Sequence, residues 1–448
     1  MKFKKILLPF LLLILTNTLI KGKKNDFLAP SDIAFLKQMV KDVMDSSRIY
    51  PNQLISDDFG PNQTGGVLIR PGGRNSYPAF WIRDYAMSIA TGFVSQEEQK
   101  HMLLLTAKTQ SGEFKFTKWG SFIPKGAVAD HIRIDDGKPI YFPGTYSYEN
   151  QGEKKWGMQP PFCDQFFFIQ MAFHYVQSFS AFHFLNENIN GVTFIDRLEL
   201  AYQMPPTDSI TGLIEVTDEN RGVDFGFRDA IYIKGKLCFP SLLKYQASLH
   251  LAYLFREMGV HAKALFYKNE AAKIKKSIIK TFINQDGMLL ASTGTSAQSD
   301  VWATSLAIHF DVLRGNNRLK AAKHLLQGYL SGELSQKGNI RHVLASDDFN
   351  ENSSWEKSLV PKDTYQNGAY WGTPVGWVCK SIAYVNKVAA QKLATEYIHD
   401  MREGDFRKGG NFGAPWECFN GNAKQNPVYL TSVAVPFIIF SKKMKQKK

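Results

Sequence analysis

Twelve segments of helical length recur along the chain, and this recurrence limits the fold more than any other feature of the sequence. In each segment, apolar residues follow the three-to-four-residue spacing of a buried helix face or run almost without interruption. In the first segment, Ile33, Leu36, Met39, Val40 and Val43 share one face. The predicted helices are 31–46, 81–93, 95–109, 163–184, 192–203, 240–258, 260–283, 299–313, 318–330, 370–384, 387–401 and 427–440.

Short turns join several of these segments into pairs, and Gly259 marks one such turn. No shift in composition marks a domain boundary. Six consecutive antiparallel pairs predict an all-α fold, an (α/α)6 barrel that forms one domain over residues 23–441. Stretches with strand character lie between the helices, at 67–70, 114–116, 129–134, 138–142 and 212–216. Long connections in a compact protein usually carry function, so we expect them to form the functional rim of the barrel.

The formal net charge of +13 is concentrated at the two ends of the chain. Residues 2–24 hold six lysines and no acid, and residues 442–448 hold five lysines and no acid. Without these eleven lysines, 43 of the 54 basic residues remain, against 41 acidic residues. An almost neutral body without a basic stripe argues against nucleic acid as a partner.

The first 22 residues are typical of a secretory signal. Lysines at positions 2, 4 and 5 precede a ten-residue apolar run, Ile6 to Leu15, which is short for a membrane span. The chain is therefore expected to be exported, to the periplasm or outside the cell. An uncleaved anchor that ends near Ile20 is the alternative. The tail at 442–448 is interpreted as a basic extension.

The cysteines and histidines do not form a metal-binding pattern. Cys163, Cys238, Cys379 and Cys418 are widely spaced, and buried free thiols are expected. No HExxH motif and no nucleotide-binding motif is present, so no metal or other cofactor is predicted. No stable protein partner is inferred.

Five loop segments combine glycine, aromatic residues and a carboxylate near a helix entrance. They are 71–85, 221–229, 299–302, 365–374 and 409–419. Tryptophan beside Asp, Glu or Arg suits a sugar site, because the apolar ring face stacks on an aromatic ring while hydroxyls bond to carboxylates or guanidinium groups.

These segments resemble, in order, the motifs of the inverting (α/α)6-barrel, or six-hairpin, glycosidases, a clan that includes trehalases, processing α-glucosidases and glucoamylases. The PGGR sequence at 71–74 and Trp81 are similar to the first trehalase signature, with Asp84 displaced by Ile82 and Arg83. The GVDFGFR sequence at 222–228 is similar to the family's acid motif. Residues 366–377 resemble its second signature, and 409–417 resemble its glycine-rich run before a Glu.

The resemblance implies a glycoside hydrolase with Asp224 as general acid and Glu417 as general base. In this mechanism one carboxylic acid protonates the leaving oxygen while the opposite carboxylate activates a water molecule. Val223 and Phe225 flank Asp224, and an apolar setting would raise its pKa toward the donating form. Asp229 is a rival acid from the same loop.

The expected sugar contacts come from the same five segments. They are Arg74, Trp81, Arg83, Asp84, Arg228, Asp229, Asp300, Trp302, Gln366, Asn367, Tyr370, Trp371 and Trp416. Several have structural alternatives. Asp224 could pair with Arg228, Asp300 could cap a helix above a core Trp302, and Trp371 could be core.

The sequence thus predicts an enzyme that removes a terminal sugar from an oligosaccharide or polysaccharide fragment with inversion. A polysaccharide lyase or unsaturated-uronide hydrolase on a similar helical toroid is the alternative, since Arg74, Arg83, Arg133 and His131 could face a uronate. A non-catalytic carbohydrate-binding protein is a third possibility.

Overall fold

The computed structural model describes residues 27–74, 76–223 and 226–442, and this part of the chain contains twelve α-helices. All twelve predicted helices are confirmed. They are α1 (Pro30–Ser47), α2 (Ile82–Ser88), α3 (Gln96–Thr109), α4 (Phe162–Phe179), α5 (Phe194–Gln203), α6 (Cys238–Glu257), α7 (His261–Phe282), α8 (Val301–His309), α9 (Gly315–Leu330), α10 (Val375–Ile382), α11 (Lys387–Glu403) and α12 (Thr431–Phe440).

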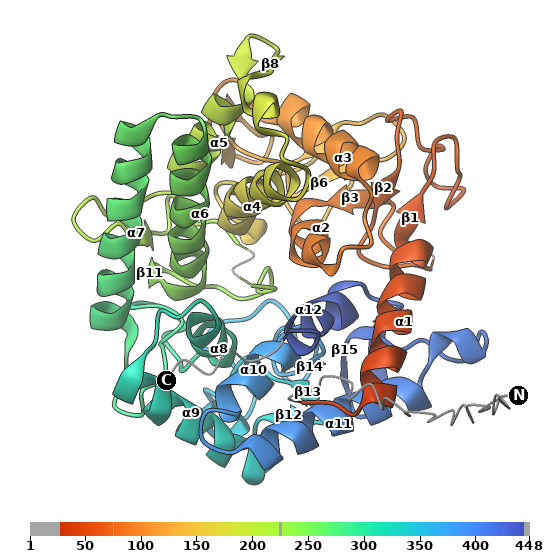
Figure 1. The fold of residues 1–448 in the computed structure, drawn as a ribbon, viewed down its shortest axis with the longest axis vertical. Coiled ribbons are helices and arrows are strands. Elements are labelled where there is room, and N and C mark those ends of the chain that lie inside the picture. Colours follow the sequence, from red (N-terminus) through yellow and green to blue (C-terminus); the bar gives the residue numbers. More distant parts are fainter. Residues whose placement is uncertain (1–26, 75, 224–225, 443–448) are drawn as a thin grey trace, which may run out of the picture.

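The even-numbered helices pack against one another in cyclic order. Helix α2 contacts α4, α4 contacts α6, and the series continues through α8 and α10 to α12, which contacts α2 again. Odd-numbered helices lie outside this series, and α7 packs along α6 at its outer edge (Figure 1). The arrangement is two layers of helices around a shared apolar centre.

Burial explains why the two sets of helices take different places. Every residue of α8 from Val301 to Ile308 is buried, and in α12 Ile438 alone between Thr431 and Phe440 is not fully buried. Helices that are apolar all round need neighbours on every side. Helix α7 instead buries one stripe, including Ile274 and Ile278, and leaves most of its lysines exposed. Such an amphipathic helix suits the outer layer.

Short strands lie in the connections between the helices. Each of the five predicted strand segments contains one: β2 (Leu68–Ile69), β4 (Lys115–Phe116), β6 (His131–Arg133), β7 (Pro139–Ile140) and β10 (Ile214–Val216). Strand β6 lies between β3 (Ala79–Trp81) and β7 in an antiparallel sheet. Strand β1 (Arg48–Ile49) pairs with β2, β5 (Phe122–Ile123) with β4, β8 (Asn188–Ile189) with β9 (Val192–Thr193), and β11 (Gly235–Leu237) with β10.

A five-stranded antiparallel sheet was not predicted. Its order is β12 (Ser335–Gln336), β13 (Asn339–Ile340), β14 (Tyr370–Trp371), β15 (Trp416–Asn420) and β16 (Ala423–Pro427). Residues 370–371 therefore begin as a strand, and the predicted helix starts at Val375. This sheet carries Glu417 on β15, which the sequence placed in a glycine-rich loop.

The predicted signal at 1–22 lies outside the described residues, as does the basic tail beyond Lys442. Among the described residues, no helix combines the length and the hydropathy needed to span a membrane. All four cysteines are buried and unbonded, as expected. Buried apolar side chains from Phe27 to Phe440 form one continuous core.

Candidate active site

A cavity of about 200 Å³ opens where the amino-terminal ends of the inner helices meet. Its walls combine acidic, aromatic and basic side chains from segments far apart in the sequence. They are Pro71, Tyr77, Trp81, Arg83, Asp84, Asp130, His131, Pro143, Gly144, Thr145, Tyr146, Asp229, Tyr365, Glu417 and Tyr429. A small enclosed site with convergent polar groups is the usual form of a ligand site.

Glu417 is held in this cavity by the sheet and by two side-chain hydrogen bonds. Glu417 is 1% exposed. The Tyr77 hydroxyl donates to its Oε2 at 2.8 Å, and Asn426 on the neighbouring strand β16 donates to the same oxygen. Burial raises the pKa of Glu417 to about 7, although the hydrogen bonds from Asn426 and Tyr77 favour the charged form. A carboxylate with such a pKa can accept a proton near neutral pH.

Asp229 is a second buried carboxylate in the same cavity. Gln366 donates its amide to Oδ2 at 2.8 Å, and the Tyr365 hydroxyl donates to the same oxygen at 3.3 Å. The amide oxygen of Gln366 accepts the backbone N–H of Ala230 at 2.7 Å, which fixes the amide's orientation. Burial raises the pKa of Asp229 despite the neighbouring Arg83. A raised pKa favours the protonated, donating form.

Arg83 joins Asp229 to Asp84. Its guanidinium lies 3.4 Å from a carboxylate oxygen of each. It also lies over the ring of Phe227, 4.2 Å from the centroid. Asp84 accepts a hydrogen bond from the Tyr429 hydroxyl at 2.7 Å, and burial raises its pKa. These contacts tie the start of α2 to the residues before α12 and to the 226–230 segment.

Trp81 and His131 form one wall of the cavity. They are paired in the β3–β6 register, and their rings stack with centroids 4.3 Å apart and planes 14° apart. The Nδ1 of His131 lies 2.7 Å from Asp130 Oδ2. The Nε2 of His131 is buried without a hydrogen-bond partner among the described residues. Because His131 lines the cavity, this nitrogen is available to a ligand hydroxyl.

Backbone strain gathers around the same cavity. Positive φ angles occur at Tyr77 (59°), Phe227 (59°), Tyr365 (43°), Asn426 (41°) and Val428 (59°). Positive φ is uncommon outside glycine, and for a β-branched residue such as valine it is an outlier. Residues held this way cluster at functional sites.

The structure brings five of the predicted site residues into the cavity wall: Trp81, Arg83, Asp84, Asp229 and Glu417. Gln366 lies directly behind Asp229. Asp224 lies outside the described residues, so its role as the general acid stays a prediction.

Arg228 and Asp300 contact each other instead of the cavity. Both are completely buried, and Arg228 Nη2 donates to Asp300 Oδ1 at 2.6 Å. The same oxygen accepts the backbone N–H of Ala303, so Asp300 caps α8. This arrangement is the structural alternative given above for Asp300, and Arg228 pairs with it rather than with a cavity residue.

The remaining predicted contacts lie apart from the cavity wall. Trp302 and Trp371 are fully buried in the core beneath Phe227. Asn367 accepts backbone hydrogen bonds from Ser354 and Trp355. The other three are partly exposed: Tyr370 on β14, Trp416 on β15, and Arg74 on a loop, where it donates to the carbonyl groups of 406, 409 and 410. Sugar contact by these residues stays a prediction.

Sequence reasoning missed much of the aromatic and acidic wall. The missed residues are Tyr77, Asp130, Tyr146, Tyr365 and Tyr429. Tyr77 follows the PGGR motif by three residues, and Tyr365 directly precedes Gln366, so both lie beside segments already singled out. Asp130 and Tyr146 come from the long loop between α3 and α4, where no local pattern distinguishes them.

The described residues hold no group of three or more His, Cys, Asp or Glu side chains placed to bind a metal ion. The carboxylates of the cavity contact Tyr, Gln, Asn, His and Arg partners. The chemistry available from these residues is proton donation and acceptance by buried carboxylic groups beside aromatic rings.

No protein-family model and no curated protein matches the sequence. Solved structures do match the fold. Glucoamylase from Saccharomycopsis fibuligera aligns with 93% of this chain and 96% of its own, at a TM-score of 0.55 and 10% identity. The GH78 family rhamnosidase of Bacillus sp. GL1 aligns with 94% of this chain and 36% of its own, at a TM-score of 0.52 and 10% identity. The chain therefore has the helical architecture of these (α/α)6-barrel glycosidases, and spans about a third of the rhamnosidase.

Proposed function

We propose that this protein is an inverting glycoside hydrolase that removes a terminal sugar from an oligosaccharide or polysaccharide fragment. The proposal rests on one observation: Glu417 and Asp229, from the 226–230 segment, line the same small cavity, and the pKa of Glu417 is about 7. The cyclic helix contacts and the two structural neighbours support a closed (α/α)6 barrel around it.

In the proposed reaction Glu417 is the general base. Its carboxylate accepts a proton from a water molecule, whose oxygen bonds to the anomeric carbon as the bond to the leaving oxygen breaks. Tyr77 and Asn426 both bond to Oε2, which leaves Oε1 of Glu417 for the water. The leaving oxygen takes its proton from a carboxylic acid on the opposite side of the sugar.

The acid comes from the loop before α6. The motif resemblance favours Asp224, whereas Asp229 has the burial and raised pKa that an acid needs. Both carboxylate oxygens of Asp229 are engaged, Oδ2 by Gln366 and Tyr365 and Oδ1 by Arg83, as expected for a residue held in place to orient a sugar hydroxyl. We therefore assign Asp224 as the acid and Asp229 as a sugar-hydroxyl contact.

The size and charge of the cavity support a neutral terminal sugar as its occupant. A volume of about 200 Å³ accommodates a single ring, which favours cleavage at a chain end. Four carboxylates line the cavity, Asp84, Asp130, Asp229 and Glu417, and Arg83 is engaged with two of them. A uronate would meet this acidic wall, so the lyase alternative is disfavoured. Arg133, another arginine that the lyase alternative relied on, pairs with Asp135.

The test is a screen of aryl glycosides and oligosaccharides against the wild type, Asp224→Asn, Asp229→Asn and Glu417→Gln. We expect Glu417→Gln and Asp224→Asn to lose on the order of 10²–10⁴ in turnover on substrates with poor leaving groups. A dinitrophenyl glycoside needs no protonation on departure, so the variant that keeps activity on it identifies the acid.

Asp286→Asn is the matched control, because Asp286 is an exposed carboxylate on a turn away from the cavity. Full activity in both Glu417→Gln and Asp224→Asn would contradict the proposal. Release of a product with a new near-ultraviolet absorbance from a uronide polymer would favour the lyase. Sugar binding without release of product would favour a binding protein. Export of the chain also stays a proposal, which rests on the charged and apolar pattern of residues 1–22.

A further inference from the structure

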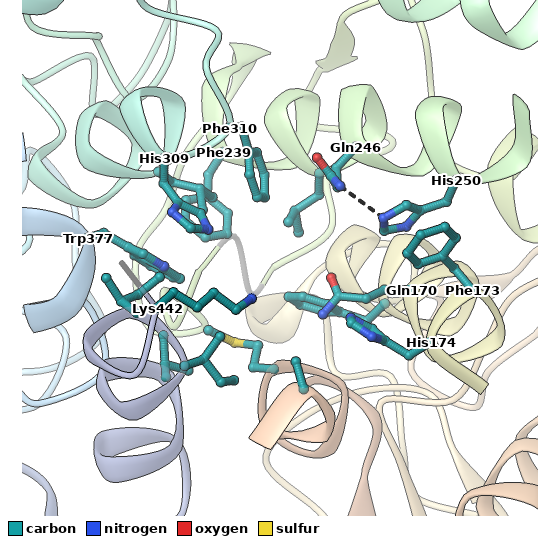
Figure 2. A pocket seen from close by; sticks show the side chains of 18 residues that line it. Gln170, Phe173, His174, Phe239, Gln246, His250, His309, Phe310, Trp377 and Lys442 are labelled. Carbon is teal, nitrogen blue, oxygen red and sulfur yellow. Dashed lines mark hydrogen bonds between the residues drawn. The ribbon is translucent and has the colours of Figure 1, made fainter. Parts of the chain in front are cut away.

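A second cavity, of about 250 Å³, lies among the inner helices α2, α4, α6, α8, α10 and α12 (Figure 2) and shares no lining residue with the cavity that holds Glu417. Six polar side chains from α4, α6, α8 and the end of α12 line it: Gln170, His174, Gln246, His250, His309 and Lys442. None of them takes part in the proposed reaction. Arg83 and Met87 lie one turn apart on the short helix α2, and each lines a different one of the two cavities.

The charge of this second cavity is one-sided. No Asp or Glu is among its described lining residues. Figure 2 shows the side chain of Lys442 reaching across the cavity with its ammonium group between His309 and His174. Burial, and next the charge of Lys442, lower the pKa of His174 to about 4. Burial, Lys380 and Lys442 lower the pKa of His309 to about 3. These imidazoles are therefore neutral at pH 7, and Lys442 supplies the positive charge.

Most of the polar groups already have partners, and two do not. Gln246 donates to His250 Nε2 at 2.9 Å, Gln170 donates to the carbonyl oxygen of Ala86 at 2.9 Å, and His309 Nδ1 lies 3.1 Å from Lys380 Nζ. Within the described part of the chain, no hydrogen bond engages the side chain of His174 or Lys442. A ligand that enters the cavity therefore meets one ammonium group and one neutral imidazole to which no described residue is hydrogen-bonded.

The rest of the wall is apolar and largely aromatic. Phe173 stacks on His250 with centroids 4.0 Å apart and planes 7° apart. Phe239, Phe310 and Trp377 contribute further rings. Burying an apolar ligand body against such a wall is favourable in proportion to the area removed from water. The cavity thus combines an apolar wall with a single positive charge.

We propose that this cavity is a binding site for a small organic monocarboxylate with an apolar body. Its carboxylate pairs with the Lys442 ammonium group and accepts a hydrogen bond from His174. Its body lies against Phe173, Phe310 and Trp377. The site is separate from the proposed active site, and its occupant differs in charge from a neutral sugar.

The test compares three probes of one shape, 4-phenylbutyrate, 4-phenylbutan-1-ol and 4-phenylbutylamine, by calorimetry on the full chain. We expect the carboxylate to bind with a Kd of about a millimolar or tighter. We expect the alcohol to bind about tenfold more weakly or worse, because it has no charge to pair with the ammonium group. The amine is expected not to bind.

Lys442→Gln should weaken phenylbutyrate binding about tenfold or more, and Lys323→Gln, an exposed lysine on α9, should leave it unchanged. Glu417→Gln should also leave it unchanged, since Glu417 lies in the other cavity. Equal affinity for acid and alcohol, normal binding in Lys442→Gln, loss of binding in Glu417→Gln, or no binding of the acid at about 10 mM would each overturn the proposal. Lys442 is exposed, so this variant is expected to fold, and its melting temperature is the check.

Discussion

Tyr77 donates its hydroxyl hydrogen to Glu417 across 2.8 Å, although 340 positions separate them in the sequence. Asn426 donates both to that hydroxyl, at 2.9 Å, and to Glu417. The three side chains form a closed set of hydrogen bonds, and two of them, Tyr77 and Asn426, have positive φ angles. The backbone is thus held in an uncommon conformation at the point where it fixes the proposed base.

This set of hydrogen bonds predicts the pH dependence of activity. Glu417 must be deprotonated to act as a base, so kcat/KM should fall as the pH drops through about 7. Tyr77→Phe removes a hydrogen-bond donor that favours the charged form of Glu417. The pH at which kcat/KM falls should therefore rise by about one unit. The measurement is a pH profile of kcat/KM. Tyr146→Phe, which alters a cavity tyrosine without a hydrogen bond to Glu417, is the control, and equal profiles for both variants would contradict the account.

Glu417 should also affect stability in a pH-dependent way. Its pKa is about 7 in the folded protein against 4.5 for an ordinary glutamate, so the native state binds the proton more tightly. Its contribution to stability is fully present below about pH 4.5 and is lost as the pH rises through 7, by on the order of 3 kcal/mol. Urea unfolding at pH 5 and pH 8 should show a larger drop for the wild type than for Glu417→Gln. The same drop in both proteins would contradict the burial-raised pKa.

Removal of one partner of the buried Arg228–Asp300 pair should destabilise the protein strongly. Asp300→Ala leaves a fully buried guanidinium group without its partner and removes the cap of α8. We expect a loss of about 3–5 kcal/mol in the free energy of unfolding. Asp286→Ala, at an exposed carboxylate, should cost less than about 0.5 kcal/mol. Equal effects of the two changes in urea titrations would contradict the structural role of Asp300.

His131 is expected to contact the substrate through Nε2. His131→Phe keeps a flat ring against Trp81 but removes both nitrogens. We expect kcat/KM to fall by about 10–100-fold, since a sugar hydroxyl would lose its partner in a buried site. Steady-state kinetics on the substrate from the screen measures this, with the melting temperature as a check on folding. Full activity of His131→Phe would limit the residue to stacking.

The helices could be predicted because each carries its own periodic pattern, and burial of one face is a local requirement. The site was harder to predict. Glu417 and Trp81 stood beside recognisable motifs, but Asp130 enters the cavity only through the pairing of β6 with β3, which is a long-range contact. A two-residue strand such as β13 or β14 has too few residues to show alternation, so the five-stranded sheet left no local signal.

The aromatic residues show a second limit of sequence reasoning. Trp81 faces the cavity whereas Trp302 and Trp371 are completely buried, yet all three lie next to a helix start in glycine- or acid-containing segments. A tryptophan that stacks on a sugar and one that packs beneath the site have the same local surroundings in the sequence. They differ only in their packing, because Trp302 and Trp371 lie against the ring of Phe227.

The central claim is that a water molecule activated by Glu417 attacks the sugar from the side opposite the leaving group. Proton NMR of the first product formed from a defined glycoside tests this directly, because the anomeric signals of the two configurations differ. The account predicts that the first-formed sugar has the opposite configuration to the substrate, and that Glu417→Gln forms it at least several hundred-fold more slowly. A first product of the same configuration as the substrate would contradict it.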